Sequence, residues 1–348
     1  MKHAQQINWT SNTQSITIKG IVMLNINKRT KPLISLLMFC ITLSFTIQCA
    51  ATSINDVVHE EITIWSQGVR LAGDIYKPKG LSPTQKLPGI LLVPGWGGSK
   101  ENLKTNYGPQ FAKLGFIVLA FDYKSWGNSD GPIVPTDALA YSQEATKLDI
   151  NATHIRKVIE PFSMLADVRA ALHYLGGEPQ VMTNNLGIWG TSLGGGLAMV
   201  MAATDARIKV LVDQMGPVNY VHNLRELPLA MARKIETLTA RGILPAFPDA
   251  TMANNPALKG YPNWPAMKRF NPMNYVDQLN VPTLIIDAEN ETLFDRTQNG
   301  MLLHNSIKGR LETKYIAYPG GHYDLYKGEN QKAAFKETSD WLVKYLKP

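Results

Sequence analysis

Residues 186–201 read LGIWGTSLGGGLAMVM, and this stretch decides the fold. A short apolar run, residues 186–189, leads into GTSLG at residues 190–194, and an apolar segment with helical spacing follows. A Gly-x-Ser-x-Gly motif between a strand and a helix is typical of a sharp turn that holds a serine hydroxyl clear of the sheet. Glycine at both ends of the motif leaves room for that turn. The stretch therefore predicts a strand, a nucleophilic Ser192 and a helix, with a closely packed but inert turn as the alternative.

Further apolar runs of the same kind occur along the chain, and they predict the rest of the sheet. Strands buried on both faces read as continuous apolar runs, which is typical of a parallel sheet covered by helices. The runs occupy residues 88–93, 116–121, 186–189, 210–212 and 283–286, followed by a last strand at 313–318. Helical patterns separate or follow them at about residues 101–114, 162–175, 197–203 and 330–346.

The N-terminal part of this domain reads differently, because residues 61–66 and 71–77 alternate apolar and polar side chains around Gln67-Gly68. Such alternation predicts an antiparallel hairpin with one wet face. The fold class that follows is α/β: a doubly wound, mostly parallel sheet with antiparallel N-terminal strands.

Two connections interrupt the alternation of strands and helices. Residues 132–160 form a polar connection, which we expect to be partly helical. Residues 217–280 are longer and carry seven prolines after Pro217, together with six aromatic residues. Because long insertions in compact domains are usually functional, we expect a helical cap over the carboxyl ends of the strands, where open α/β sheets bind ligands. A surface excursion that only covers the sheet edge is the alternative.

Residues 1–51 read as a leader rather than as part of the fold. They contain five cations and no acidic residue, and residues 32–47 form an uncharged, mostly apolar run. Cys49-Ala50-Ala51 then offers small residues suited to cleavage before Thr52. We expect a secretory signal peptide, with Met23 as a plausible true start and an uncleaved anchor as the alternative. The expectation is therefore an exported, periplasmic or secreted domain at residues 52–348 that has no membrane association after cleavage.

The composition of that domain excludes several classes of function. Both cysteines, Cys40 and Cys49, lie in the leader, so the mature chain has no thiol nucleophile, disulfide or cysteine metal site. Removing the leader leaves 30 basic against 28 acidic residues, which gives no case for nucleic-acid binding. No histidine and acid cluster has metal-ligand spacing, and the segment GGSK at residues 97–100 lacks the first glycine of a phosphate loop. We expect neither a cofactor nor a metal.

A serine hydroxyl needs a base to take its proton, and histidine is the usual base at neutral pH. In a fold of this kind the order along the chain is serine, acid, histidine. His222, His304 and His322 follow Ser192. His222 precedes every candidate acid and His304 falls within an apparent helix, whereas His322 follows the last strand on a glycine-flanked loop. His322 is therefore the candidate base.

The acid should follow the strand at residues 283–286, from where it can orient the imidazole. Four carboxylates compete for the role: Asp287, Glu289, Glu291 and Asp295. Asp287 ends the strand, and Glu291 comes one turn later at a loop position that can reach His322. Glu291 is the first candidate and Asp295 the second.

An acyl-transfer site also needs donors for the oxyanion. The backbone N–H of Leu193, directly after the serine, is one candidate. The loop at residues 94–98, PGWGG, offers the other, and we favour the N–H of Trp96.

Taken together, the motifs make the chain resemble the α/β-hydrolase superfamily, and within it the dienelactone-hydrolase and Xaa-Pro-peptidase-like branch. The motifs are VPGWGG at 93–98, FDYKSWGNSDG at 121–131, GTSLG at 190–194, DAENE at 287–291 and GGH at 320–322. The branch usually has G-E-x-D near the acid, where this chain has Ala288-Glu289-Asn290-Glu291. Its oxyanion loop often begins His-Gly, where this chain has Pro94-Gly95.

The resemblance and the residues together imply a serine hydrolase that cleaves an ester or related acyl bond of a small molecule through an acyl-Ser192 intermediate. A serine peptidase or an acyltransferase would use the same chemistry. A non-catalytic binding protein on the same fold is the alternative of another class.

Overall fold

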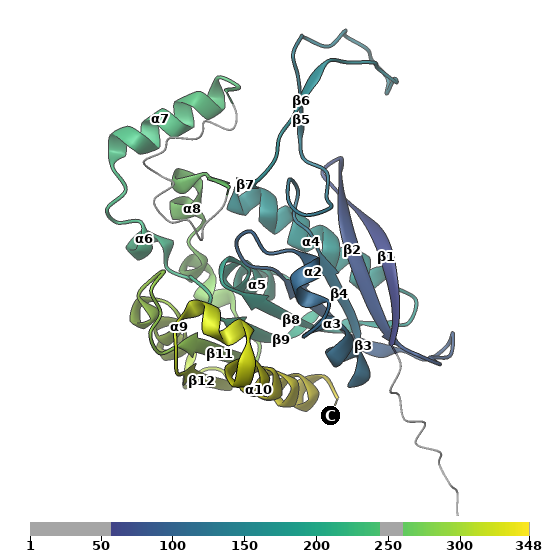
Figure 1. Ribbon diagram of the computed structural model, residues 1–348, viewed down its shortest axis with the longest axis vertical. Helices are drawn as coiled ribbons and strands as arrows, with labels where there is room; N and C mark the ends of the chain where they lie inside the picture. Colours follow the sequence, from purple (N-terminus) through teal and green to yellow (C-terminus); the bar gives the residue numbers. More distant parts are fainter. Residues whose placement is uncertain (1–56, 244–259, 348) are drawn as a thin grey trace, which may run out of the picture. The chain divides into compact units, whose positions relative to one another are not determined.

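An eight-stranded sheet runs through the part of the chain that the computed structural model describes, residues 57–243 and 260–347 (Figure 1). The strands lie in the order β1-β2-β4-β3-β8-β9-β11-β12. β1 pairs with β2 and β2 with β4 in antiparallel fashion, and every other pair in this sheet is parallel. Their bounds are Val57–Ser66, Val69–Pro78, Ile117–Phe121, Leu87–Val93, Val181–Thr191, Ile208–Gln214, Thr283–Ala288 and Thr313–Tyr318. The predicted doubly wound sheet with antiparallel N-terminal strands is confirmed.

The expected leader, residues 1–51, lies outside the described residues, and so does the stretch 244–259 of the expected cap. Among the described residues, no helix combines the length and the apolar character needed to cross a membrane.

Helices cover both faces of the sheet because neighbouring residues of each strand point to opposite sides. On one face α4 (Pro161–Gly177) and α5 (Leu193–Thr204) share a core with Ile188, and on the other α3 (Gly108–Lys113) and α10 (Gly328–Leu346) share a second core with Trp189. The continuous apolar runs are therefore strands whose side chains pack into both cores, as the sequence predicts.

Two segments differ from the expected helices. The stretch 101–114 is divided into α2 (Lys100–Leu103) and α3, because Gly108-Pro109 begins a new helix with proline in its first turn. The stretch 132–160 is not helical: it forms a hairpin of β5 (Ile133–Pro135) and β6 (Ala152–His154), then β7 (Val158–Ile159).

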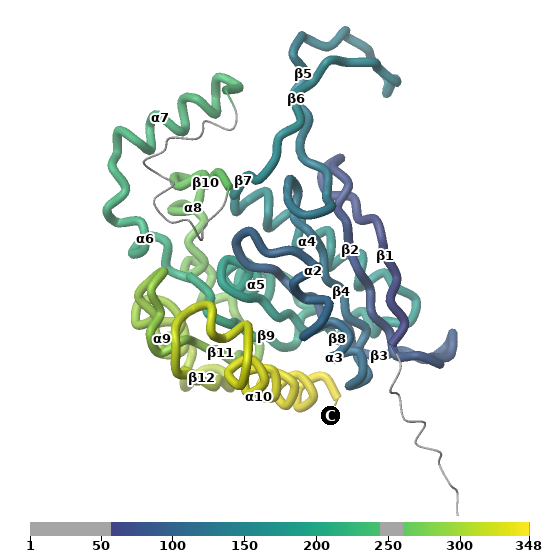
Figure 2. Tube along the Cα trace, viewed as in Figure 1, coloured from purple at the N-terminus to yellow at the C-terminus, as the bar shows by residue number. Residues whose placement is uncertain are grey.

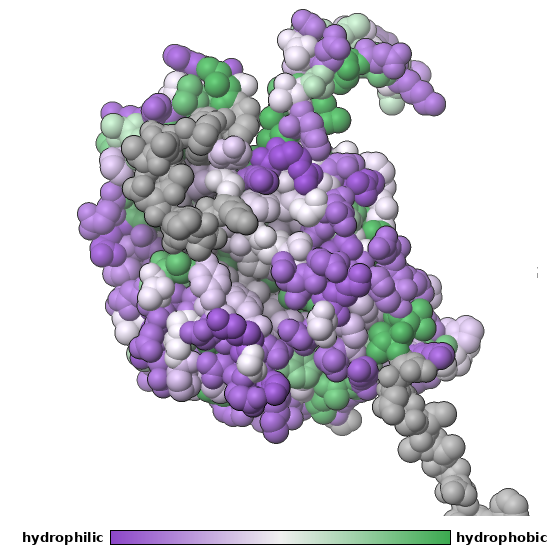
Figure 3. Space-filling view, in the orientation of Figure 1, coloured by the Kyte–Doolittle hydropathy of each residue, from purple (hydrophilic) through white to green (hydrophobic). Residues whose placement is uncertain are grey.

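Two prolines explain why this stretch is not helical. Pro132 and Pro135 disfavour a helix and keep the residues before them extended. The hairpin projects from the body of the domain (Figure 2), and Figure 3 shows both hydrophilic and hydrophobic residues on its surface. The side chains of Ile133 and Tyr141 are strongly exposed.

The chain between β9 and β11 contains α6 (Tyr220–Asn223), α7 (Leu229–Ala240), β10 (Tyr261–Pro262), α8 (Trp264–Phe270) and the 3₁₀ helix η2 (Pro272–Gln278). The side chain of Asn263 accepts a hydrogen bond from the N–H of Ala266 and so caps α8. α8 packs against α4, α6 and α7. β10 pairs with β7 in parallel, so this segment is joined to the strand that follows the hairpin. The last elements are η3 (Arg296–Gln298), α9 (Gly300–Ile307) and η4 (His322–Tyr326).

The turn from β8 into α5 is the most confined part of the backbone. Ser192 has φ 52° and ψ −130°, a conformation that costs a non-glycine residue free energy and that persists only where its surroundings enforce it. A Cβ at Gly190 would collide with the carbonyl of Gly194, and a Cβ at Gly194 would collide with the carbonyl of Val93. The two glycines of the motif are therefore required by close backbone approach.

We expect Gly190→Ala to destabilise the protein by about 3 kcal/mol, because the added methyl group must displace backbone rather than a flexible side chain. Chemical denaturation measures the effect. Gly177→Ala is the matched control, since a Cβ at that helix end meets nothing within 4 Å. Equal stability of the two variants would contradict the close approach.

Candidate active site

Ser192 lies at the carboxyl end of β8, where two cavities meet. It lines a cavity of about 370 Å³ together with His322 and a second cavity of about 250 Å³ together with Leu193. Leu193 is the first residue of α5, so its N–H has no intrahelical acceptor and the positive end of the helix dipole faces this point. A negative charge that forms beside Ser192 is stabilised by this arrangement.

The structure brings His322 and Glu291 together. Nδ1 of His322 lies 2.6 Å from Oε2 of Glu291, and the side chains are only 2% and 1% exposed. The other carboxylate oxygen of Glu291 accepts a hydrogen bond of 2.8 Å from the N–H of Leu293. Glu291 is thus held in place at both oxygens, and Nδ1 is the ring nitrogen of His322 that the contact with Glu291 occupies.

The other sequence candidates lie elsewhere. Asp295 accepts hydrogen bonds from the N–H and the hydroxyl of Thr297 at the exposed start of η3. His304 lies 3.3 Å from the hydroxyl of Thr313, and His222 contacts Arg225 at the surface. Glu289 is exposed. Of the candidates for acid and base, only Glu291 and His322 are in contact with each other within the described residues.

The loop at residues 94–98 approaches Ser192 closely. A Cβ at Gly95 would lie 3.0 Å from the carbonyl of Thr191 and 3.1 Å from Cβ of Ser192, so the loop lies against the serine. Trp96 lines both cavities beside Ser192. Its ring centroid lies 5.5 Å from that of Trp264 in α8.

Lys100, at the end of the GGSK segment, is buried. Its Nζ lies 2.9 Å from Oδ1 of Asp74, which also lies 3.0 Å from Nε2 of His59. Burial alone would raise the pKa of Asp74, but bonds to Lys100 and His59 lower it below its usual value. The N–H of Lys100 also donates to Asp122. Lys100 therefore connects the end of the loop at residues 94–98 to β2.

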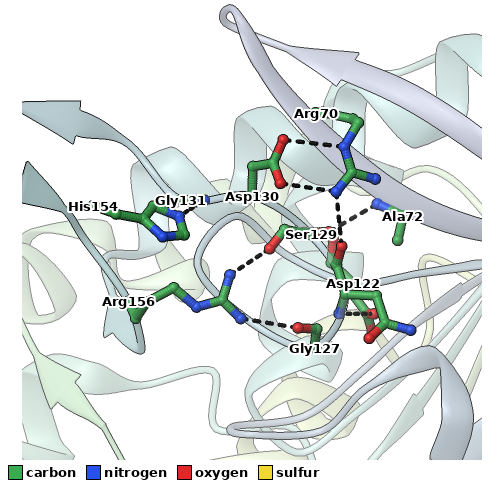
Figure 4. Close-up of polar contacts among 10 residues, drawn as sticks. Arg70, Ala72, Asp122, Gly127, Ser129, Asp130, Gly131, His154 and Arg156 are labelled. Carbon is green, nitrogen blue, oxygen red and sulfur yellow. Dashed lines mark hydrogen bonds and ion pairs between the residues drawn. The ribbon is translucent and has the colours of Figure 1, made fainter. Parts of the chain in front are cut away.

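The motif at residues 121–131 folds into a polar loop that supports this region (Figure 4). Asp122 accepts from the N–H of Asn128, and its carbonyl accepts from the hydroxyl of Ser129 at 2.6 Å. Arg70 makes two bonds to Asp130, of 3.0 and 2.8 Å, and Arg156 donates to carbonyls of the same loop. These bonds hold the loop between β2 and the strand that follows the hairpin.

Trp126, within that loop, donates to the carbonyl of Val158 and lies in van der Waals reach of Gly97. The loop thus positions the segment that contains Trp96.

Two buried carboxyls lie beneath the site, and the sequence reasoning did not single them out as a pair. Burial raises the pKa of Asp287 to about 7, and the charge of Glu291 adds to this, while Tyr315 and Arg296 act in the opposite direction. Burial also raises the pKa of Asp213 well above its usual range, and Asp287 contributes. Glycines at 195, 216 and 300 make room for them, since a Cβ at each would collide with one of the carboxyls. Such glycines after adjacent parallel strands are the signal that could have revealed the pair.

A third cavity, of about 210 Å³, lies at the base of the hairpin and contains neither Ser192 nor His322. Across the described ranges, no group of three or more histidine, cysteine or acidic side chains could hold a metal ion.

Known proteins and protein families are similar to this chain in sequence. The model of the dienelactone hydrolase family matches residues 72–238, and that of the BAAT / acyl-CoA thioester hydrolase C-terminal family matches residues 168–323. The quorum-quenching protein AidA of Acinetobacter baumannii (strain MDR-ZJ06) is 25% identical over 327 residues, which cover 84% of this chain and 98% of that protein.

Two solved structures share the fold. The α/β hydrolase GrgF from Penicillium sp. sh18 superposes with a TM-score of 0.60 at 16% identity, over 84% of this chain and 99% of that one. The esterase Pf2001 of Pyrococcus furiosus superposes with a TM-score of 0.55 at 14% identity, over 84% and 92% of the two chains. Together with the two family-model matches, this likeness places the chain in the α/β-hydrolase superfamily. The proteins that it resembles include hydrolases of the dienelactone hydrolase and esterase type.

We expect Asp287→Asn to change how the free energy of unfolding depends on pH. With its pKa raised to about 7, folded Asp287 keeps a proton that the unfolded chain releases above about pH 4. The wild type therefore loses stability as the pH rises through about 7, whereas the neutral amide does not. Between about pH 5 and about pH 8, the free energy of unfolding of the variant should rise by up to about 3 kcal/mol relative to that of the wild type. Urea denaturation at a series of pH values measures this difference.

Asp295→Asn is the control for this measurement. Hydrogen bonds from Thr297 lower the pKa of Asp295, so its carboxylate is charged in both states over that range and the stability difference should stay constant. A constant difference for Asp287→Asn as well would contradict the raised pKa.

Proposed function

We propose that this protein is a serine hydrolase that cleaves an ester or related acyl bond through an acyl-Ser192 intermediate. The observation that carries the proposal is the buried 2.6 Å contact between His322 and Glu291, in the cavity that Ser192 also lines. The strained backbone at Ser192 supports it further, because such strain is concentrated at functional sites.

In the proposed reaction, Ser192 attacks the acyl carbon while His322 takes the hydroxyl proton. The N–H groups of Leu193 and Trp96 bind the oxyanion. His322 then gives the proton to the leaving group, and a water molecule releases the acyl group by the same steps. Glu291 fixes the orientation of the imidazole and stabilises its charged form.

The lining of the two cavities favours an uncharged substrate, and therefore an ester before a peptide. Apart from His322, none of the described side chains that line them is acidic or basic. A peptidase that recognises a free amino terminus needs a carboxylate near the scissile bond. Hydrolysis of aminoacyl p-nitroanilides without hydrolysis of p-nitrophenyl esters would favour the peptidase, and acyl transfer to an added alcohol without hydrolysis would favour the acyltransferase.

We also propose that the protein is exported. The basic residues 28–31, the apolar run 32–47 and the small residues after Cys49 support a signal peptide, and the absence of cysteine from residues 52–348 suits an oxidising compartment. Cell fractionation tests this, and full-length protein confined to the cytosol would contradict it.

A fluorophosphonate probe should label the purified protein, and Ser192→Ala should abolish labelling, because the probe requires an activated serine. Ser82→Ala, a change of an exposed serine that lines neither cavity, is the control and should keep the label. Labelling of the Ser192→Ala variant would assign the nucleophile elsewhere, and an unlabelled wild type would favour a binding protein.

Glu291→Gln should lower kcat by about 1,000- to 10,000-fold, because the amide no longer stabilises the imidazolium or its tautomer. Asp295→Asn should leave kcat within about threefold, since its carboxylate is committed to Thr297. Steady-state kinetics on a p-nitrophenyl ester measures both. The reverse order of effects would make Asp295 the acid.

A further inference from the structure

We propose that the two cavities at Ser192 divide the substrate: the cavity beside α8 takes the acyl group, and the cavity beside His322 takes the leaving group. The substrate class that follows is an uncharged ester with an apolar acyl group of medium size and a polar leaving group. This inference rests on the proposed serine hydrolase function.

The two cavities are distinct spaces that share one wall. Trp96, Ser192 and Leu293 line both of them, so these residues form the boundary at which the scissile bond would lie. The cavity that we call the acyl cavity has a volume of about 250 Å³, and the one that we call the leaving-group cavity has about 370 Å³.

Proton transfer decides which cavity holds which part. The leaving group must receive its proton from His322, so it has to lie within reach of that ring when the bond breaks. His322 lines the larger cavity and not the smaller one. The acyl group stays bonded to Ser192 after the leaving group departs. It therefore occupies the other side, where Leu193 supplies its N–H.

The acyl cavity is lined mostly by apolar groups, although the buried hydroxyl of Tyr220 there has no hydrogen-bond partner among the described residues. Apart from the residues at the boundary and Leu193, it is lined mainly by large apolar and aromatic side chains: Tyr220, Leu224, Trp264, Met267 and Phe294. Asn223 also lines it, but its amide exchanges hydrogen bonds of 3.0 and 2.9 Å with the amide of Asn299 and is satisfied. The transfer of an apolar group from water into such a space is favourable.

The volume of the acyl cavity limits the size of that group. An apolar cavity of roughly 150 Å³ holds one benzene molecule, so this cavity accommodates an aromatic ring with a short linker or a chain of about six to eight carbons. Tyr220 and Met267 are buried, so they close off the inner part of the cavity.

More hydroxyl and amide side chains line the leaving-group cavity than the acyl cavity, and its lining among the described residues contains no acidic or basic side chain other than His322. Ser99, Asn102, Asn106, Thr191 and Tyr323 bring hydroxyl and amide groups to it. Amides and hydroxyls bind polar, uncharged groups such as those of a hydroxylated or amide-bearing alcohol.

The test uses two matched tryptophan substitutions that fill one cavity each. Leu224 lines only the acyl cavity and is partly buried, and Asn106 lines only the leaving-group cavity and is exposed. kcat/KM is measured with p-nitrophenyl esters from acetate to decanoate, and with butyrate esters of alcohols of increasing size. Fluorophosphonate labelling of Ser192 confirms that each variant is folded and active.

Leu224→Trp should lower kcat/KM for the octanoate at least tenfold while acetate changes by less than about threefold. Asn106→Trp should leave the dependence on acyl length unchanged and lower kcat/KM for the larger alcohols. Trp264→Ala serves as a second variant in case Leu224→Trp does not fold, and it should shift the preferred ester to longer chains.

The exchanged pattern, in which Asn106→Trp shortens the acyl preference, would overturn the division. Unchanged profiles in all three variants would overturn it as well. Failure of the proposed function itself looks different, because the wild type would then neither hydrolyse p-nitrophenyl acetate nor react with the fluorophosphonate.

Discussion

The structure depends on backbone packed directly against backbone at the carboxyl ends of β3 and β8. The chain at Gly190 lies against Gly194, Gly194 lies against the end of β3, and Gly95 lies against Ser192. No side chain separates these segments, so the nucleophile and the loop that faces it form one rigid unit. The positive φ of Ser192 persists because this unit leaves the serine no alternative conformation.

Polar groups extend that rigidity outward. Lys100 is paired with Asp74 in the interior, and Asp122 binds backbone N–H groups on both of its sides. A buried pair of this kind adds little net stability, but the loss of one partner would leave a charge without compensation. The consequence is that the loop at residues 94–98 has one well-defined position, which a preorganised oxyanion site requires.

Much of this architecture follows from local patterns in the sequence. The apolar runs predict the parallel strands because a strand buried on both faces need not alternate apolar and polar residues. GTSLG predicts the sharp turn at Ser192 because only glycine fits at its two ends. Strand order predicts that Glu291 and His322 follow neighbouring strands, and the structure brings the two side chains to within 2.6 Å of each other.

The remaining features were set by contacts distant in sequence. The stretch 132–160 pairs with itself and with β10, and a residue-by-residue pattern carries no record of such pairing. Likewise, the space for the buried Asp213 and Asp287 depends on Gly195 and Gly300, which belong to the helices α5 and α9, as well as on the neighbouring Gly216.

The short pairing of β7 with β10 has a mechanical consequence. Tyr261 and Asn263 donate their N–H groups to the carbonyls of Lys157 and Ile159, and Trp264 follows at once. Two backbone hydrogen bonds therefore join the segment after the β5–β6 hairpin to the start of α8. Because Trp264 lines the cavity beside Ser192, the projecting hairpin and the wall of that cavity belong to one continuous hydrogen-bonded scaffold.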